Sequence, residues 1–140
     1  MNKFEEVYHQ IINEEINNDR RACTPEEEQW FKSNGFYGCF DPNNNPKHYL
    51  GIFKEFKEGK DINSDQLYAV LKNGQWIIGT RLTGKKARYI GSKKVHGTGS
   101  TPEEAYTDFI KKESETIDYI LQKINDEKAK FEAYKASLNS

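Results

Sequence analysis

Residues 66–82 read QLYAVLKNGQWIIGTRL, and this stretch decides the fold that the sequence predicts. Both halves are rich in strand-forming residues, and the dipeptide Asn73-Gly74 lies between them. Asn-Gly is the strongest short signal for a β-hairpin, because both of its positions tolerate the positive φ angles of a two-residue turn. The sequence therefore predicts antiparallel strands at 66–72 and 75–82.

A third strand is expected over residues 86–95, after a turn at Thr83-Gly84. If both turns have two residues, the alternation of side chains assigns every strand position to one of two faces. The predicted core face carries Leu67, Ala69, Leu71, Trp76, Ile78, Leu82, Ala87 and Tyr89. The opposite face is half basic and carries Tyr68, Val70, Lys72, Ile77, Arg81, Lys86, Arg88 and Ile90. An apolar stripe on this second face predicts a protein contact, unless the N-terminal helices cover it, at Val70, Ile77 and Ile90.

Helices are expected on both sides of this meander. Apolar spacing predicts helices at 3–18 and 46–58, although His48–Phe53 could instead be a strand. The capping box that begins at Thr24 predicts a short helix between them, and Thr101 with Glu104 predicts the start of a long helix over about 102–137. We therefore expect one α+β domain with N-terminal helices, a three-stranded antiparallel β-meander and a long C-terminal helix. Its parts are a helical region at 1–65, a basic meander at 66–100 and the C-terminal helix at 101–138.

The C-terminal helix is too long for a small sheet, at about 1.5 Å per residue. Apolar residues recur in it every seven positions, at Ile110, Ile117, Ile124, Phe131 and Leu138. The overhanging part must contact the N-terminal helix or a second copy of the chain, and this spacing permits a coiled-coil homodimer. Glu113 and Glu127 weaken the dimer hypothesis, because they occupy core positions of the heptad.

Charge is distributed unevenly along the chain. The formal net charge is −1. Residues 66–102 contain no acid, whereas both flanking regions are acidic. This basic segment either pairs with the acidic helices or binds a phosphate-bearing partner. In the second case we expect nucleic-acid contacts from all of its bases, which are Lys72, Arg81, Lys85, Lys86, Arg88, Lys93 and Lys94.

No catalytic motif, metal-ligand spacing or cofactor signature is found in the sequence. The three histidines and two cysteines are scattered, so we expect a protein that is not an enzyme and that has no cofactor and no metal. Residues before the last helix could bind an anion through free backbone N–H groups, although two glutamates in the first turn would repel it. This weaker anion site would comprise His96, Gly97, Thr98, Gly99 and Ser100.

The order of elements from Tyr68 to Lys112 resembles the DNA-binding domain of plant ethylene-response factors and the related arm-binding domain of phage tyrosine integrases. The matching features are Trp76 in the second strand, the basic stretch 86–91 and the Thr-Pro-Glu-Glu-Ala-Tyr sequence at 101–106. The resemblance implies a sheet in the major groove, with contacts from Lys72, Arg81, Lys86 and Arg88. The first strand of that family is rich in arginine and this one is not, so phosphate contact is implied more than base reading. The same pattern also resembles small phage-encoded α/β sandwich proteins.

Three functions are consistent with these patterns. The first is a non-catalytic nucleic-acid-binding protein, with DNA favoured, that a mobile element could encode. The second is a small phage-type inhibitor or adaptor that binds a host protein in an anti-defence role. The third is a binder of a phosphorylated nucleotide. The chain contains no apolar run of membrane-spanning length and no signal peptide, so we expect a cytoplasmic location and no membrane partner.

Overall fold

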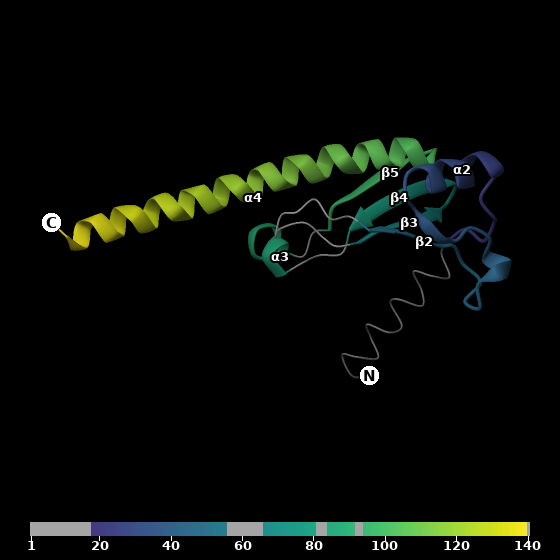
Figure 1. Ribbon diagram of the computed structural model, residues 1–140, viewed down its shortest axis with the longest axis horizontal. Helices are drawn as coiled ribbons and strands as arrows, with labels where there is room; N and C mark the ends of the chain where they lie inside the picture. Colours follow the sequence, from purple (N-terminus) through teal and green to yellow (C-terminus); the bar gives the residue numbers. More distant parts are fainter. Residues whose placement is uncertain (1–17, 56–65, 81–83, 92–93, 140) are drawn as a thin grey trace.

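The computed structural model describes residues 18–55, 66–80, 84–91 and 94–139. The protein is of the α+β class, with one antiparallel sheet in which neighbouring strands follow chain order (Figure 1). The strands are β1 (Tyr37–Cys39), β2 (Gly51–Glu55), β3 (Gln66–Lys72), β4 (Gln75–Thr80) and β5 (His96–Gly99). The helices are α2 (Pro25–Ser33), the single 3-10 turn η1 (Pro42–Asn44), α3 (Gly84–Ile90) and α4 (Pro102–Leu138).

The predicted hairpin is confirmed and forms the centre of the sheet. Asn73 and Gly74 adopt φ angles of 55° and 73°, and Leu71 pairs with Trp76 across the ladder. The described strand β4 ends at Thr80, and residues 81–83 lie outside the described part of the chain. Strand β5 extends the sheet beyond β4 and pairs Gly97 with Ile78.

One face of the sheet is buried under two helices. The predicted core residues of β3 and β4 are at most 1% exposed, namely Leu67, Ala69, Leu71, Trp76 and Ile78. Helix α4 packs on β4 and β5, and α2 contacts α4 at the same end of the molecule (Figure 1). Phe31 of α2 meets Trp76 with ring centroids 5.1 Å apart, so the aromatic residues of the helix and sheet form one core. Burial of these rings removes large apolar surfaces from water and stabilises the fold.

Helix α4 approaches β5 unusually closely. A Cβ atom added at Gly97 would overlap the backbone of Ala105 and Phe109. Glycine at this position therefore allows the helix backbone to lie directly against the strand. The helix begins with Thr101, whose hydroxyl accepts a hydrogen bond from the Glu104 N–H at 3.2 Å, as its capping sequence predicts.

Two sequence predictions of secondary structure are wrong. The predicted third strand at 86–95 is replaced by helix α3, and the strand that follows it is short. Lys-Lys-Ala-Arg is a good helix-forming sequence, and Gly91, with φ 70°, follows the helix as a typical left-handed end. The predicted helix at 46–58 is not formed, and the alternative of a strand is confirmed: β2 lies at Gly51–Glu55, where Ile52 pairs with Ala69 and is buried in the core. The predicted helix at 3–18 lies almost wholly outside the described residues.

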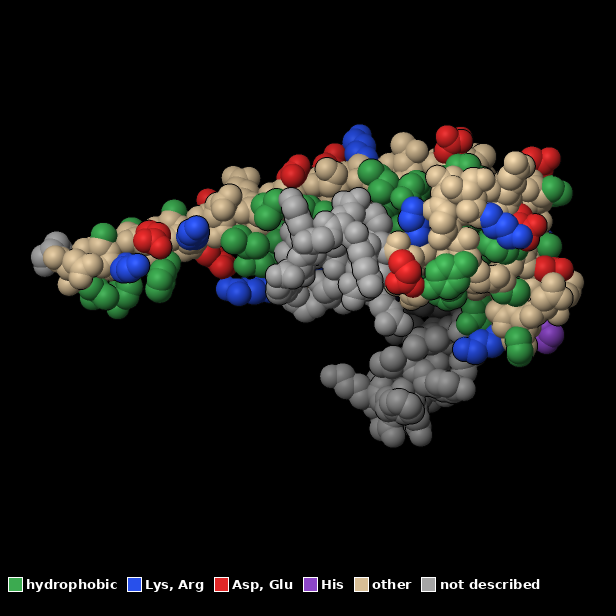
Figure 2. Space-filling view, viewed as in Figure 1, with side chains coloured by type: hydrophobic (Ala, Val, Ile, Leu, Met, Phe, Trp, Pro, Cys, Tyr) green, Lys and Arg blue, Asp and Glu red, His purple; other side chains and the backbone are tan. Residues whose placement is uncertain are grey.

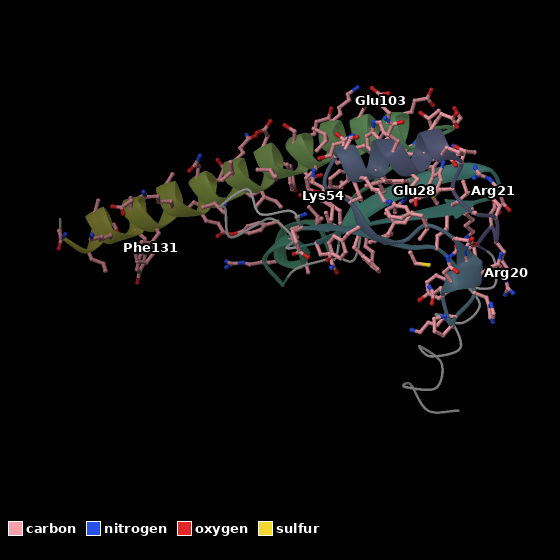
Figure 3. The ribbon with its side chains drawn as sticks, turned by 45° about the vertical axis from the view of Figure 1, so that its right-hand side comes forward. Arg20, Arg21, Glu28, Lys54, Glu103 and Phe131 are labelled. Atoms are coloured by element: carbon pink, nitrogen blue, oxygen red, sulfur yellow. The ribbon has the colours of Figure 1, made fainter. Side chains whose placement is uncertain are left out.

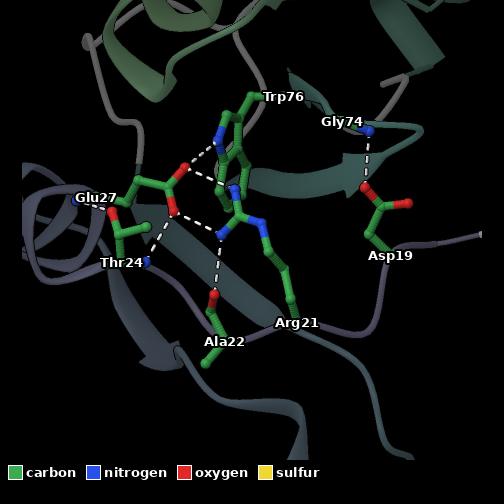
Figure 4. Close-up of polar contacts among 7 residues, drawn as sticks. All are labelled: Asp19, Arg21, Ala22, Thr24, Glu27, Gly74 and Trp76. Atoms are coloured by element: carbon green, nitrogen blue, oxygen red, sulfur yellow. Dashed lines mark hydrogen bonds and ion pairs between the residues drawn. The ribbon is translucent and has the colours of Figure 1, made fainter.

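The chain before α2 is fixed to the hairpin by polar contacts (Figure 4). The Asp19 carboxylate accepts hydrogen bonds from the backbone N–H groups of Asn73 and Gly74 at 2.9 and 2.7 Å. Glu27 accepts from the Trp76 indole at 2.7 Å and from Arg21 at 2.8 Å. The predicted α2 is confirmed, since its capping box at Thr24 and Glu27 is formed in full.

Helix α4 continues far past the sheet (Figure 1). Its buried side chains end at Ile120, and every residue from Asn125 to Asn139 is exposed. The predicted overhang is therefore present. None of the helices in the described ranges is long and apolar enough to cross a bilayer.

Candidate functional site

The basic residues of the predicted nucleic-acid surface do not gather on one sheet face. Lys72 lies in β3 and Lys94 is exposed just before β5. Lys86 and Arg88 belong to α3, not to a strand. Arg81 and Lys93 lie outside the described residues, as does the side chain of Lys85. A three-stranded basic face of the kind that the resemblance requires is absent from the described sheet.

Lys86 is withdrawn from the surface. Its ammonium forms an ion pair with the Glu113 carboxylate of α4, and the two side chains are 1% and 2% exposed. Its Nζ also lies 3.5 Å from the Thr80 hydroxyl. A buried charge needs a partner of opposite sign, and Glu113 supplies it. The burial and the ion pair of Lys86 therefore do not favour its predicted phosphate contact.

Arg88 and Tyr89 connect α3 to the middle of α4. The Arg88 guanidinium lies 3.2 Å from the Glu127 carboxylate, and the Tyr89 hydroxyl donates to the same carboxylate at 3.4 Å. Thus both glutamates that interrupt the apolar heptad of α4 have partners on α3. The basic segment was expected either to pair with acidic helices or to bind a phosphate-bearing partner. For Lys86 and Arg88 the structure favours the first explanation, because both pair with glutamates of α4.

The expected anion site at 96–100 consists of β5 and Ser100, just before α4, and carboxylates accept the hydrogen bonds of its donors. Asp108 accepts from the Thr98 N–H at 3.0 Å, and Glu104 accepts from the Ser100 N–H and hydroxyl at 3.0 and 2.8 Å. The Ser100 hydrogen bonds lower the pKa of Glu104, and the Lys112 side chain and the Thr98 N–H lower that of Asp108. Two carboxylates therefore stand where an anion would have to bind, and this arrangement does not favour the expected anion site.

The face of the sheet opposite the core is hollowed. A hollow of about 490 Å³ spans β2, β3 and β4 and is lined by apolar side chains together with two lysines and a histidine. Val70 and Ile77 face each other across the ladder, as predicted, but Ile90 is in α3 and does not extend their stripe. Gly79 leaves room for the Tyr68 ring, since a Cβ there would lie 2.9 Å from the Tyr68 hydroxyl oxygen. The lining includes Phe53, Tyr68, Val70, Ile77, Lys72, Lys94 and His96.

The distal part of α4, residues 124–138, presents an apolar stripe to solvent. Phe131, Tyr134 and Leu138 are 63%, 62% and 67% exposed. Phe131 projects from the helix far from the sheet (Figure 3). At 3.6 residues per turn these side chains continue the stripe that packs α4 on the sheet, with Ile124 between the two parts. The apolar pattern that packs α4 on the sheet therefore continues along the helix past the end of the core. We call it the distal stripe, and its members are Ile124, Phe131, Tyr134 and Leu138.

Lysines border the distal stripe on both sides. At about 100° per residue, Lys123 and Lys130 lie along one edge, and Lys128 and Lys135 lie along the other. The acidic residues Asp126 and Glu132 fall further around the helix, whereas Glu127 lies within the stripe and forms an ion pair with Arg88. Hydrophobic side chains gather along one edge of the distal helix with lysine or arginine beside them in Figure 2. Sequence reasoning found the apolar repeat but did not use its lysine flanks, which the same helical spacing could have revealed.

Together these features define an α+β protein with a five-stranded meander, a hollowed sheet face and a protruding amphipathic helix whose distal stripe is bordered by lysines. Comparison with known protein families, curated proteins and solved structures returned no match. Among the described residues, no three His, Cys, Asp or Glu side chains are grouped as metal ligands would be. The function is therefore argued from the two surfaces just described.

Proposed function

We propose that this protein is a non-catalytic protein-binding module, of the adaptor or inhibitor kind, and that the distal stripe of α4 is its docking element. The observation that carries this proposal is the apolar stripe of Phe131, Tyr134 and Leu138, exposed on a helix that extends beyond its own domain. Burying such side chains stabilises a complex by about 1.5–3 kcal/mol each before the costs of association. A helix that offers apolar residues at this spacing fits a groove or a second helix.

The lysine borders support an acidic partner. In a two-helix coiled coil, the residues that flank the apolar seam face the flanks of the other helix. Lys123 and Lys130 would meet lysines of a second copy in a parallel pair, and they would also meet lysines in an antiparallel pair. Like charges in these positions oppose association, so the predicted homodimer is disfavoured. A partner helix with apolar core positions and glutamates on both flanks would bury the apolar stripe and pair with the lysines that border it.

A designed helix tests this proposal without knowledge of the natural partner. The acidic probe carries leucine at its core positions and glutamate on both flanks, and it is labelled for fluorescence anisotropy. We expect saturable binding to the full chain, weakened at least about tenfold by Phe131→Ala, which corresponds to 1.4 kcal/mol. Ala133→Ser, on the opposite side of the same helix, is the matched control and should bind as the wild type does. Equal binding by both variants would refute the docking site.

Nucleic-acid binding is a second candidate, and the lining of the hollowed sheet face is the observation in its favour. Lys72 and Lys94 line the hollow, and positively charged side chains attract phosphates. Binding to a random duplex should weaken steeply as salt rises, because phosphate contacts release counterions. The variant Lys72→Glu with Lys94→Glu should lose this binding, whereas Lys47→Glu, in an exposed loop, should keep it. Equal binding by the two variants would remove this candidate.

A further inference from the structure

A row of aromatic side chains crosses the hollowed face of the sheet. Phe53 of β2 pairs with Tyr68 of β3. From Tyr68 the ladder continues through Gly79 of β4 to His96 of β5. Side chains at paired positions point to the same side of a sheet, and Ile52, next to Phe53, is buried in the core on the other side. The aromatic row, defined as Phe53, Tyr68 and His96, therefore lines the hollow.

The Tyr68 ring leans across β4. A Cβ atom added at Gly79 would lie 2.9 Å from the Tyr68 hydroxyl oxygen and 3.1 Å from the His96 Cβ. Glycine at this position lets the ring lie along the sheet, over the backbone of the next strand. Tyr68 and Phe53 are both half-buried, so part of each side chain is accessible to a ligand.

Cations lie on both sides of the aromatic row. Lys72 comes four residues after Tyr68 in β3, and Lys94 comes two residues before His96. Because β3 and β5 both run antiparallel to β4, these two lysines lie on opposite sides of the row. Both line the hollow, and no aspartate or glutamate is among its described lining residues. The hollow thus combines aromatic rings with positive charge at two places.

The β1 edge of the same face is acidic. Glu55 comes two residues after Phe53 in β2, so it points to the same side of the sheet. Its carboxylate accepts a hydrogen bond from the Tyr37 hydroxyl at 2.7 Å. A carboxylate repels phosphates, so a phosphate-bearing ligand is expected toward β3 and β5, where the lysines are.

We propose that the aromatic row and its two lysines bind single-stranded nucleic acid, with bases stacked on Tyr68 and Phe53. A single strand alternates flat bases with phosphates, and aromatic rings between cations match this alternation. In a duplex the bases stack on one another, so a ring on the sheet finds no free base to stack on. The inference deepens the nucleic-acid candidate and rests on it, whereas the distal stripe is on another element and plays no part in it.

Fluorescence anisotropy with a labelled oligothymidylate of about twelve nucleotides tests the proposal in the full chain. At low salt we expect saturable binding that is about tenfold tighter than binding to a duplex of the same length. Equal or tighter binding to the duplex would overturn the inference and leave the nucleic-acid candidate standing. Binding to neither would overturn both, and the acidic probe tests the docking function independently of either result.

Substitutions in the aromatic row separate stacking from a structural role. Tyr68→Leu keeps an apolar side chain without the ring and should weaken oligothymidylate binding about tenfold, a usual effect of losing one stacking contact. Tyr68→Phe keeps the ring and should lose much less affinity. Tyr119→Leu makes the same change at an exposed tyrosine of α4 and should bind as the wild type does.

Phe53→Leu repeats the test at the second ring, and melting curves of all the variants show which of them fold. A folded Tyr68→Leu or Phe53→Leu protein that binds oligothymidylate as tightly as Tyr119→Leu does would overturn the proposal.

Discussion

The carboxylate of Glu27 in α2 accepts a hydrogen bond of 2.7 Å from the indole Nε1 of Trp76 in β4 (Figure 4). These residues are far apart in the sequence, and their contact joins the helix to the central hairpin. The same carboxylate accepts from Arg21 and from the Thr24 N–H, so it satisfies a helix cap, an ion pair and a buried indole together. Glu27 therefore links the local capping motif to the tertiary fold. The sequence reveals the capping motif but not the contact with Trp76.

Glu27 should make folding stability depend on acid. Burial raises its pKa, but hydrogen bonds from Arg21, Thr24 and Trp76 outweigh this effect and lower the pKa from 4.5 to about 2. Because the folded-state pKa lies below the unfolded one, this contribution is complete above about pH 4.5 and is lost as pH falls toward 2. Urea unfolding across this range should show the loss.

The matched comparison is Glu27→Gln against Glu26→Gln, in the same helical turn. Glu27→Gln should lower the free energy of unfolding at pH 7 by about 1–3 kcal/mol, because charged hydrogen bonds are lost. It should also flatten the pH dependence between pH 4.5 and 2, whereas Glu26→Gln should keep the wild-type profile. The role given to Glu27 would be refuted by two variants of equal stability and equal pH dependence.

The buried pair of Lys86 and Glu113 should behave differently when one partner or both are replaced. Lys86→Met alone leaves the Glu113 carboxylate buried without its cation and should cost about 3–5 kcal/mol. Lys86→Met with Glu113→Leu replaces both charges by apolar groups and should recover most of that loss. Chemical denaturation of the three proteins measures both effects. A double variant that is less stable than the single one would contradict the account.

The close approach of α4 to β5 makes Gly97 sensitive to a single methyl group. Gly97→Ala would place its Cβ on the backbone of Ala105 and Phe109 and should cost about 3 kcal/mol or more. Gly51→Ala is the control, because its added Cβ meets its nearest atom at an ordinary 3.6 Å. Thermal unfolding of the two variants tests this difference, and similar melting temperatures would show that the helix backbone does not lie against the strand.

The sequence predicted those elements that local chemistry determines. Asn73-Gly74 specifies its own turn, and Thr24 and Thr101 specify helix starts, so the hairpin, α2 and α4 were predicted correctly. The segment at 86–95 was mistaken for a strand because the turn expected at Thr83-Gly84 was given more weight than the helix-forming Lys-Lys-Ala-Arg sequence that follows it. The region around Ile52 has apolar spacing that fits both a helix and a strand, and pairing with β1 and β3 selects the strand.

The candidate site was predicted only in part. The overhang of α4 and its apolar repeat follow from its length and heptad spacing. The basic surface was not predicted correctly, because charge counts along the chain do not reveal which side chains pair internally. Lys86 and Arg88 belong to the basic segment in the sequence, yet in the fold both face acidic residues of α4.

The distal stripe should contribute to binding and little to stability. Phe131 and Leu138 are mostly exposed in the described structure, so replacing both by alanine removes few internal contacts. The melting temperature of Phe131→Ala with Leu138→Ala should stay within about 2 °C of the wild type, as surface substitutions usually change stability by less than 0.5 kcal/mol. Binding to the acidic probe should be lost in the same variant. A large fall in melting temperature would show that the stripe is part of the core.

The central claim is that the lysine borders of the distal stripe select an acidic helical partner. The most direct test measures probe affinity after Lys123, Lys128, Lys130 and Lys135 are all changed to glutamate. The wild type should bind the acidic probe and not a probe with lysine flanks, and the variant should show the opposite preference. If the variant keeps the wild-type preference, the distal stripe does not select its partner by charge.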